Sequence, residues 1–272
     1  MAILAPWRLK GPMGYKHLTL EIADRVATLT IRRPEVKNAI DLATMDELHE
    51  AAAVLEADRT IQAVILTGGG DTFVSGGDLK SLETLEGVDA GRAMSRKMQG
   101  ILARFEGLEV PVIAAIEGYA LGGGAEVAMA CDIRIAASDA RIGFKQIAMG
   151  IMVGWGGGQR LRALVGRARA LELLLTGDVL SGEEAHRLGI VERVVPSGRA
   201  LAEAEALARR VAAQPPLAVR AIKRALYQGE AMSRESGIAF ESDCFAVLWG
   251  SRDHDEAVRA HFEKRPPTFR GE

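Results

Sequence analysis

Three segments of this 272-residue chain share one pattern: a short apolar stretch, a glycine-rich turn and then an apolar helical stretch. The middle segment, PVIAAIEGYALGGGAEVAMACD at residues 111–132, places Glu126 directly after three consecutive glycines and one alanine. Glycine destabilises a helix, and a carboxylate buried among apolar groups is costly without hydrogen-bond partners. Some other requirement must therefore explain why the glycines and Glu126 stand together in this segment. That requirement bears on the fold and on the candidate site.

The repeated pattern predicts an α/β fold. The other two segments begin with the apolar stretches AVILTGG (63–69) and DIRIAAS (132–138), each followed by glycines and a helical pattern. Alternating apolar and polar residues at 17–34 predict a hairpin that turns near Ala23–Asp24. Residues 41–58 have helical spacing, and Asp41 precedes them as a potential N-cap.

The pattern along the chain suggests three parts. We expect an N-terminal extension at 1–13, an α/β core that carries the active site at 14–199, and a helical oligomerisation segment at 200–272. The helical pattern breaks at Pro215–Pro216. Four apolar residues of the last part face either a partner subunit or the chain's own core, namely Phe240, Phe245, Leu248 and Trp249.

Composition excludes several classes of protein. With 34 basic and 36 acidic residues the formal net charge is −2, which argues against a general nucleic-acid or anionic-membrane binder. No apolar stretch approaches the roughly 20 residues that span a bilayer. Cys131 and Cys244 cannot build a disulfide framework, and no zinc-ligand spacing occurs. This cysteine usage favours a reducing cytoplasm, and the first residues make a poor signal peptide.

The glycine-rich turns do not match the common nucleotide or nucleophile motifs. None has the G-x-G-x-x-G register, and the chain contains neither a Gly-Lys dipeptide nor a G-x-S-x-G elbow. Such turns leave backbone N–H groups exposed at a helix start, where two of them can stabilise a developing oxyanion. Tight turns and close helix–strand packing explain the glycines equally well on chemistry alone.

Six segments spread over residues 15–269 together resemble the enoyl-CoA hydratase/isomerase, or crotonase, superfamily. They are RPEVKNAI (33–40), FVSGGDL (73–79), residues 111–132, GIMVGWGGGQRL (150–161), LTGDVLSGEEAHRLGIVERVVP (175–196) and HFEKRPPTF (261–269). The resemblance implies a ClpP/crotonase-like spiral of repeated ββα units with a C-terminal helical trimerisation segment. It also implies an enzyme acting on acyl-CoA thioesters, with coenzyme A as part of the substrate and with no separate cofactor or metal.

By motif position, the resemblance assigns the two oxyanion donors to the backbone amides of Ser75 and Gly123. This assignment requires both amides to be free of other protein acceptors. Contacts to CoA or substrate are implied for Val36, Lys37, Ala39, Gly77, Asp78, Leu79, Leu121, Gly122, Trp155 and Lys264.

The resemblance also implies partners. Lys264 would lie near the 3′-phosphate of CoA bound to a neighbouring subunit of a homotrimer or a dimer of trimers. Lys37 and Lys264 are equally well explained as ordinary solvated lysines. No nucleic acid or membrane is implied.

Glu126 and Gln146 are the candidate catalytic pair. Glu126 occupies the first of two glutamate positions that the hydratases of this family use, and Gln146 stands at the second. An amide can orient a water or a substrate group but cannot exchange a proton at neutral pH. If Glu126 is buried, desolvation should raise its pKa, which suits proton transfer at C2.

Three reactions remain open, together with a non-catalytic reading. Glu126 alone could activate water for hydration, or move a proton between C2 and C4 in isomerisation. The segment around Trp155 resembles the ethylmalonyl-CoA decarboxylase branch, so decarboxylation of a 2-carboxyacyl-CoA is the third possibility. A family member that only binds acyl-CoA is the non-catalytic alternative.

Overall fold

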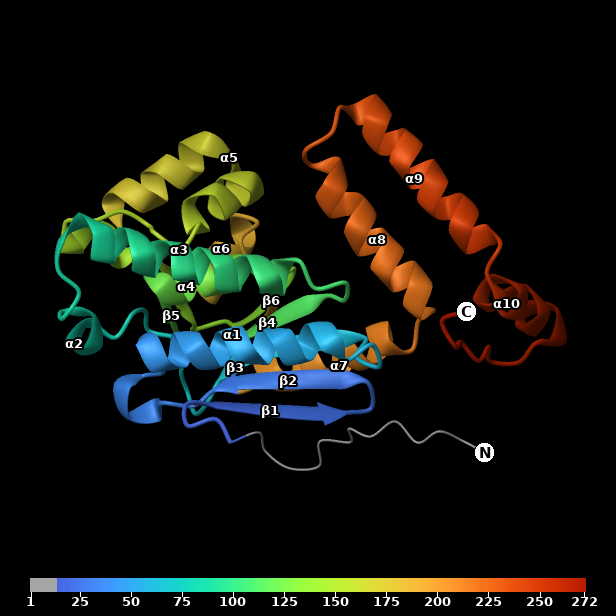
Figure 1. Ribbon diagram of the computed structural model, residues 1–272, viewed down its shortest axis with the longest axis horizontal. Coiled ribbons are helices and arrows are strands. Elements are labelled where there is room, and N and C mark those ends of the chain that lie inside the picture. The colour runs from blue at the N-terminus through green and yellow to red at the C-terminus, as the bar shows by residue number, and fades with distance from the viewer. Residues whose placement is uncertain (1–13) are drawn as a thin grey trace.

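A computed structural model describes residues 14–272, so the extension predicted at 1–13 lies outside the described residues. Figure 1 shows a layered α/β body with a helical arm at one end. A six-stranded sheet has the order β1-β2-β3-β4-β6-β9, and a three-stranded sheet has the order β5-β7-β8. The strands are β1 (Leu18–Ala23), β2 (Val26–Ile31), β3 (Ala63–Gly68), β4 (Val112–Ile116), β5 (Tyr119–Leu121), β6 (Ile133–Ala137), β7 (Arg141–Gly143), β8 (Val179–Ser181) and β9 (Arg193–Val195).

The helices account for the rest of the regular structure. They are η1 (Pro34–Val36), α1 (Leu42–Ala57), α2 (Leu79–Leu82), α3 (Gly87–Glu106), α4 (Gly123–Met129), η2 (Lys145–Met149), α5 (Gly157–Thr176), α6 (Gly182–Arg187), α7 (Ala200–Ala212), α8 (Pro216–Gly229), α9 (Arg234–Trp249) and α10 (Arg252–Glu263). Within residues 14–272, none is both long and apolar enough to cross a bilayer.

The predicted hairpin and first helix are confirmed. β1 and β2 pair antiparallel, and Asp24 and Arg25 turn the chain between them with positive φ. Asp41 caps α1, because its Oδ1 accepts a hydrogen bond from the amide of Thr44 at 2.7 Å.

Helices cover both faces of the large sheet. The apolar strands β3, β4 and β6 run parallel, so both of their faces are buried. Val64 and Leu66 of β3 point into the core that α1 and α3 share, and Ala63 and Ile65 point to the opposite face. There α7 lies on the sheet through Ala200, Ala204, Ala208 and Ala212, whose small side chains allow a close approach.

The fold repeats a strand–strand–helix unit. β4 belongs to the large sheet, β5 to the small sheet, and α4 follows; β6, β7 and α5 repeat the arrangement. The predicted α/β class is therefore confirmed. This geometry brings the starts of α4 and α5 against each other.

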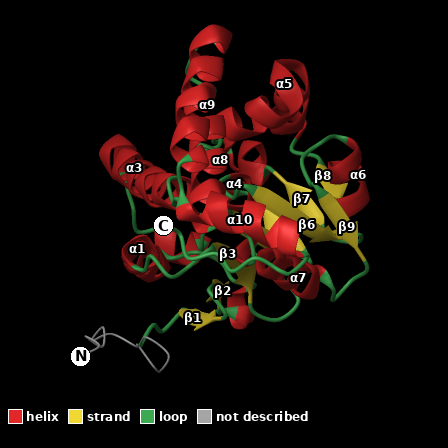
Figure 2. Cartoon of the chain, turned by 90° about the vertical axis from the view of Figure 1, so that its right-hand side faces the viewer, coloured by secondary structure: helices red, strands yellow, loops and turns green. Residues whose placement is uncertain are grey.

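The C-terminal part is helical, as predicted. Figures 1 and 2 show α8 and α9 side by side as an arm that stands away from the sheets, followed by α10. Asp132, next to β6, anchors this arm: it accepts hydrogen bonds from Lys223 Nζ at 2.7 Å and from the hydroxyl of Tyr227 at 2.5 Å. Unlike these helices, α7 packs on the main sheet and belongs to the body.

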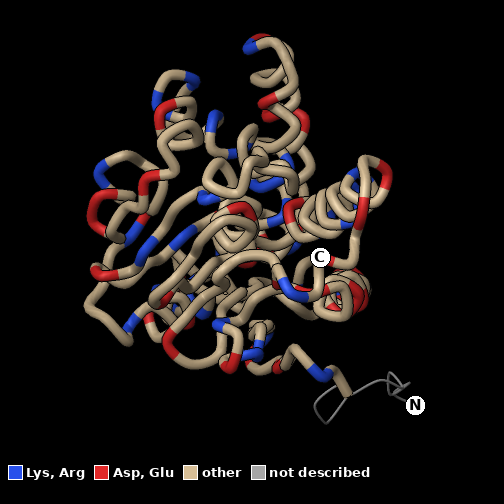
Figure 3. Tube along the Cα trace, turned by 90° about the vertical axis from the view of Figure 1, so that its left-hand side faces the viewer, with Lys and Arg blue, Asp and Glu red and all other residues tan. Residues whose placement is uncertain are grey.

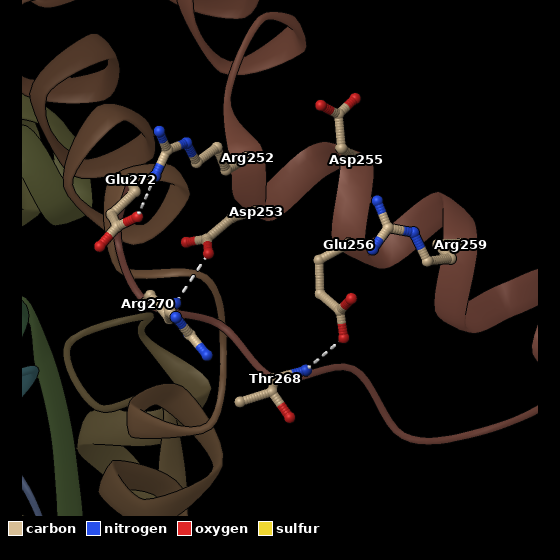
Figure 4. A pocket seen from close by; sticks show the side chains of 8 residues that line it. All are labelled: Arg252, Asp253, Asp255, Glu256, Arg259, Thr268, Arg270 and Glu272. Atoms are coloured by element: carbon tan, nitrogen blue, oxygen red, sulfur yellow. Dashed lines mark hydrogen bonds and ion pairs between the residues drawn. The ribbon is translucent and has the colours of Figure 1, made fainter.

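The last residues fold back on α10. Figure 4 shows the polar pocket between them, in which Asp253 accepts from the amide of Arg270 at 2.7 Å and Glu256 from that of Thr268 at 2.9 Å. The carboxylates of this pocket thus hold the C-terminal tail in place.

The close packing of the glycine turns can be tested at Gly124. A Cβ there would lie 1.9 Å from the carbonyl oxygen of Val74. We expect Gly124→Ala to lower the free energy of unfolding by about 1–3 kcal/mol or more through overpacking. The matched control is Gly100→Ala on α3, where a Cβ has no neighbour within 4 Å. This control should raise stability by about 0.5–1 kcal/mol. Equal effects in denaturant melts would contradict the packing described.

Candidate active site

Glu126 lies in the first turn of α4 and is only 1% exposed. Each of its carboxylate oxygens accepts two hydrogen bonds. Oε1 accepts from Gln146 Nε2 at 2.8 Å and from the amide of Gly154 at 3.2 Å. Oε2 accepts from the amides of Trp155 at 2.7 Å and Gly157 at 2.9 Å. Four donors thus replace the water that burial removes from the carboxylate.

The sequence of the turn before α5 explains how three main-chain amides reach one side chain. Gly156 has φ +93°, a conformation that favours glycine. A Cβ at Gly157 would lie 2.5 Å from Cγ of Glu126, so only glycine allows this approach. These backbone donors were missed by sequence reasoning, although the run GWGGGQ was the available signal.

Gln146, on η2, is oriented by its contact with Glu126. Because a carboxylate only accepts hydrogen bonds, the amide nitrogen must face Glu126 and the amide oxygen must point elsewhere. That oxygen is buried and has no hydrogen-bond partner among residues 14–272. Because buried acceptors are normally hydrogen-bonded, this oxygen can accept a hydrogen bond from a donor such as water beside the carboxylate.

Burial dominates the electrostatics of Glu126. Desolvation raises the pKa of its carboxyl above the ordinary value, while the amides of Gly157, Trp155 and Gly154 and the side chain of Gln146 lower it and only partly compensate. The expected rise in pKa is thus present, and it has the expected cause. A carboxyl tuned in this direction is suited to exchange protons with a substrate.

The amide of Ser75 is used within the protein, since it donates to the carbonyl oxygen of Lys37 at 3.1 Å. The prediction that Ser75 supplies an oxyanion donor is therefore wrong in this structure. The loop at 33–40 passes beside this turn, and its Lys37 carbonyl occupies the Ser75 amide. Two residues further on, Gly77 has an amide to which no acceptor is assigned within residues 14–272, and the same holds for Gly123.

Gly77 and Gly123 lie close together although they belong to different turns. A Cβ at Gly76, which directly precedes Gly77, would be 3.7 Å from the nitrogen of Gly123. The ring of Trp155 lies beside both glycines, since an added Cβ would be 3.8 Å from the ring at Gly77 and 2.2 Å from it at Gly123. Trp155 therefore links the free amides to Glu126, whose Oε2 its own backbone amide contacts.

The loop at 33–40 is fixed by buried polar contacts. Arg33 pairs with Asp41 at 3.0 Å and with Asp78 at 2.9 Å. Asn38 is fully buried and donates to the carbonyl oxygens of Gly69 and Thr72. The carboxylate of Asp78 is thus used inside the protein, where it also caps α2, and the predicted contact of this residue with substrate stays a prediction.

The other predicted contact residues are divided between two places. Seven lie around the glycine turns or on the adjoining loop: Val36, Lys37, Ala39, Gly77, Leu79, Leu121 and Gly122. Lys37 Nζ lies 4.9 Å from the centre of the Tyr119 ring. Lys264 follows α10, which lies across the molecule from α2 and β5 in Figure 1, so a single chain does not bring it to the site.

A family model described as enoyl-CoA hydratase/isomerase matches residues 21–272. The chain belongs to this family. It is 38% identical to the crotonyl-CoA hydratase of Syntrophomonas wolfei, over 94% of this chain and 99% of that protein. It is also 38% identical to the short-chain-enoyl-CoA hydratase of Clostridium acetobutylicum, over 93% of this chain and 97% of that protein.

Solved structures agree. The enoyl-CoA hydratase of Bacillus anthracis superposes with a TM-score of 0.91 at 34% identity, covering 94% of this chain and all of that chain. The structure of EchA1 from Mycobacterium marinum, an enoyl-CoA hydratase, superposes with a TM-score of 0.84 at 38% identity. The match covers 94% of this chain and 99% of that chain. The predicted superfamily and the crotonase fold are both confirmed.

The contact between Gln146 and Glu126 predicts a shift in titration. Burial raises the pKa of Glu126, so on acidification its carboxyl should take up a proton at a pH above 4.5, the ordinary pKa of glutamate. Gln146→Met removes a donor that stabilises the ionised form, so the midpoint should move to higher pH. The titration can be followed by ¹³C NMR of labelled carboxyls.

The neighbouring residue provides the control for this titration. Lys145→Met removes a side chain that donates to the carbonyl of Gly177 and does not contact Glu126, so it should leave the midpoint in place. A midpoint that moves equally in both variants, or in neither, would contradict the assigned contact.

Proposed function

We propose that this protein hydrates short-chain 2-enoyl-CoA thioesters, with Glu126 as its only proton-transfer carboxylate. The observation that carries the proposal is the position of Glu126. The carboxylate is buried and held by four donors, it adjoins the unpaired amide oxygen of Gln146, and Trp155 links it to the free amides of Gly77 and Gly123. The names of the two relatives described above support a short-chain enoyl thioester as substrate.

The two glycine amides are the proposed oxyanion hole. Addition of water to C3 of a 2-enoyl thioester moves electrons onto the thioester oxygen, which becomes an enolate oxygen. Two unoccupied N–H groups facing that oxygen would stabilise the charge, and each such donor contributes about 2.7–4 kcal/mol to the transition state. Gly77 replaces Ser75 in this role because its amide is free.

Glu126 and Gln146 divide the work on water. The oxygen of Gln146 accepts one hydrogen bond from the water, and Glu126 Oε1 accepts the other in place of its longest contact, the amide of Gly154. As the water oxygen bonds to C3, Glu126 takes the released proton, and it then gives that proton to C2 as the enolate collapses. One carboxylate therefore completes the reaction and returns to its starting state.

Isomerisation of a 3-enoyl thioester is the second candidate, because it needs the same oxyanion donors and a single base. The observation that favours it is the absence of a second carboxylate from the contacts of Glu126 within residues 14–272. Decarboxylation is disfavoured, since an ionised Glu126 would repel a carboxylate at C2. The names of the relatives support hydration over both decarboxylation and simple binding.

A panel of CoA thioesters tests the reaction. We expect crotonyl-CoA to be hydrated, with the product identified by mass, while a 2-carboxyacyl-CoA remains unchanged. Glu126→Gln should lower kcat by at least about 10²-fold and leave binding of butyryl-CoA largely intact, because general acid–base catalysis contributes about 10²–10⁴-fold. Gln146→Glu should raise the hydration rate by restoring a second carboxylate.

Three results would count against this mechanism. Full activity of Glu126→Gln would remove Glu126 from the mechanism. Conversion of a 3-enoyl thioester without hydration would favour isomerisation. Tight binding with no turnover of any thioester would favour the non-catalytic alternative.

We further propose a homotrimer, or a dimer of trimers, in the cytoplasm, with Lys264 of one chain near the CoA of its neighbour. The arm supports this, because α9 packs on α8 and leaves Phe245 and Trp249 60% and 61% exposed. Both charge signs are interspersed over the face in Figure 3, which suits a protein without a nucleic-acid partner.

Substitution on the arm tests the oligomer. Phe245→Glu combined with Trp249→Glu should convert a trimer to a monomer in mass photometry, since buried charges would oppose the contact. The control is Ile22→Glu on β1, an exposed apolar residue away from the arm, which should leave the trimer intact. A monomeric wild-type protein would contradict the proposal.

A further inference from the structure

We propose that the indole ring of Trp155 excludes substituents at C2 of the acyl group, so that the enzyme selects 2-unbranched thioesters. This inference rests on the proposed function, because it places C2 between the glycine amides and Glu126. It assigns Trp155 a role in specificity, in addition to the backbone hydrogen bond that it donates to Glu126.

The ring stands against both glycine turns. A Cβ at Gly123 would lie 2.2 Å from Cζ3 and 2.5 Å from Cη2 of Trp155, and one at Gly77 would lie 3.8 Å from Cζ2. Three atoms on one edge of the ring thus line the turns that supply the two free amides. Because C2 of a thioester is two bonds from its carbonyl oxygen, a thioester held by these amides brings C2 within reach of this edge.

The ring is also held in place from two sides. Its backbone amide donates to Glu126 Oε2 at 2.7 Å, and its Nε1 donates to Sδ of Met94 on α3 at 3.2 Å. Only 4% of the residue is exposed. Because both ends are fixed, the ring cannot swing aside easily to admit a substituent. It forms a rigid side wall of the space in which the base and the amides meet the substrate.

Space exists beyond this wall. Trp155, Gly156 and Met129 also line a cavity of about 980 Å³ that extends between α5 and α8 and is bounded by Leu164 and Ile222. The ring therefore separates the glycine turns from an existing, mainly apolar space. Removing the ring would join the two, and a methyl group at C2 would then enter an apolar space without requiring the backbone to move.

The size of the effect follows from the cost of one methyl group. A hydrophobic pocket discriminates one methylene by about 10–200-fold when its walls do not yield. We therefore expect the wild-type protein to bind butyryl-CoA at least about 10-fold more tightly than 2-methylbutyryl-CoA. Both thioesters are saturated and cannot be hydrated, so the comparison measures binding without turnover.

The experiment measures this binding ratio by calorimetry for the wild type and four variants. Trp155→Ala and Trp155→Leu should reduce the preference for butyryl-CoA by about 10-fold or more, whereas Trp155→Phe, which keeps a flat wall, should retain most of it. Leu173→Ala is the control, because it removes a buried side chain from α5, the helix that follows Trp155 in the chain. Its binding ratio should equal that of the wild type.

Two results would overturn the inference: equal binding of the two thioesters by the wild type, or an unchanged ratio in Trp155→Ala and Trp155→Leu. A uniform loss of affinity for both thioesters would mean that Trp155 is only structural. Hydration of crotonyl-CoA is measured alongside. A wild type that fails to hydrate but shows the expected binding ratios would refute the proposed function and leave the role of Trp155 standing.

Discussion

The carboxyl side chain of Glu126, buried at the start of α4, is the group on which the rest of the site depends. A carboxylate in an apolar core is strongly disfavoured unless donors replace its hydration. Here four hydrogen bonds of 2.7–3.2 Å do so, and three come from main-chain amides of a single turn. The starts of α4 and α5 are thereby fixed to each other. The hydrogen bonds also limit how far burial raises the pKa of the carboxyl, which keeps a reactive group available.

Close packing explains why glycine recurs in the second and third of the glycine-rich segments. At Gly157 a side chain would strike Glu126, at Gly123 it would strike the Trp155 ring, and at Gly124 it would strike the carbonyl of Val74. The two explanations of the glycines, tight packing and bare amides, are thus complementary. Packing brings the turns together, and the same lack of side chains leaves the amides of Gly77 and Gly123 accessible.

Much of this arrangement could be predicted from local signals in the sequence. The alternation at 17–34, the Asp41 cap and the apolar stretches of β3, β4 and β6 determine local structure, and the structure contains each of them. Glu126 was identifiable because a carboxylate in an apolar helix is costly to bury, so its presence indicates a function. The choice between Ser75 and Gly77 was not predictable locally. It depends on the Lys37 carbonyl, which reaches Ser75 from a loop nearly forty residues away.

The donors to Glu126 were hidden for a related reason. Main-chain amides exist at every position except proline, so no residue type marks the amides that will converge. Gln146 was visible as a departure from the two-glutamate pattern. Its orientation, with nitrogen toward Glu126 and oxygen unpaired, required the geometry. The packing of α7 on the sheet was likewise not apparent from the helical character of residues 200–272.

The most direct test is a crystal structure of the protein with bound butyryl-CoA. We expect the thioester oxygen to lie about 2.7–3.1 Å from the backbone nitrogens of both Gly77 and Gly123. We also expect C2 to face the Glu126 carboxylate and the Ser75 amide to remain hydrogen-bonded to the Lys37 carbonyl. A thioester oxygen held by other groups, or an acyl chain directed away from Glu126, would contradict it.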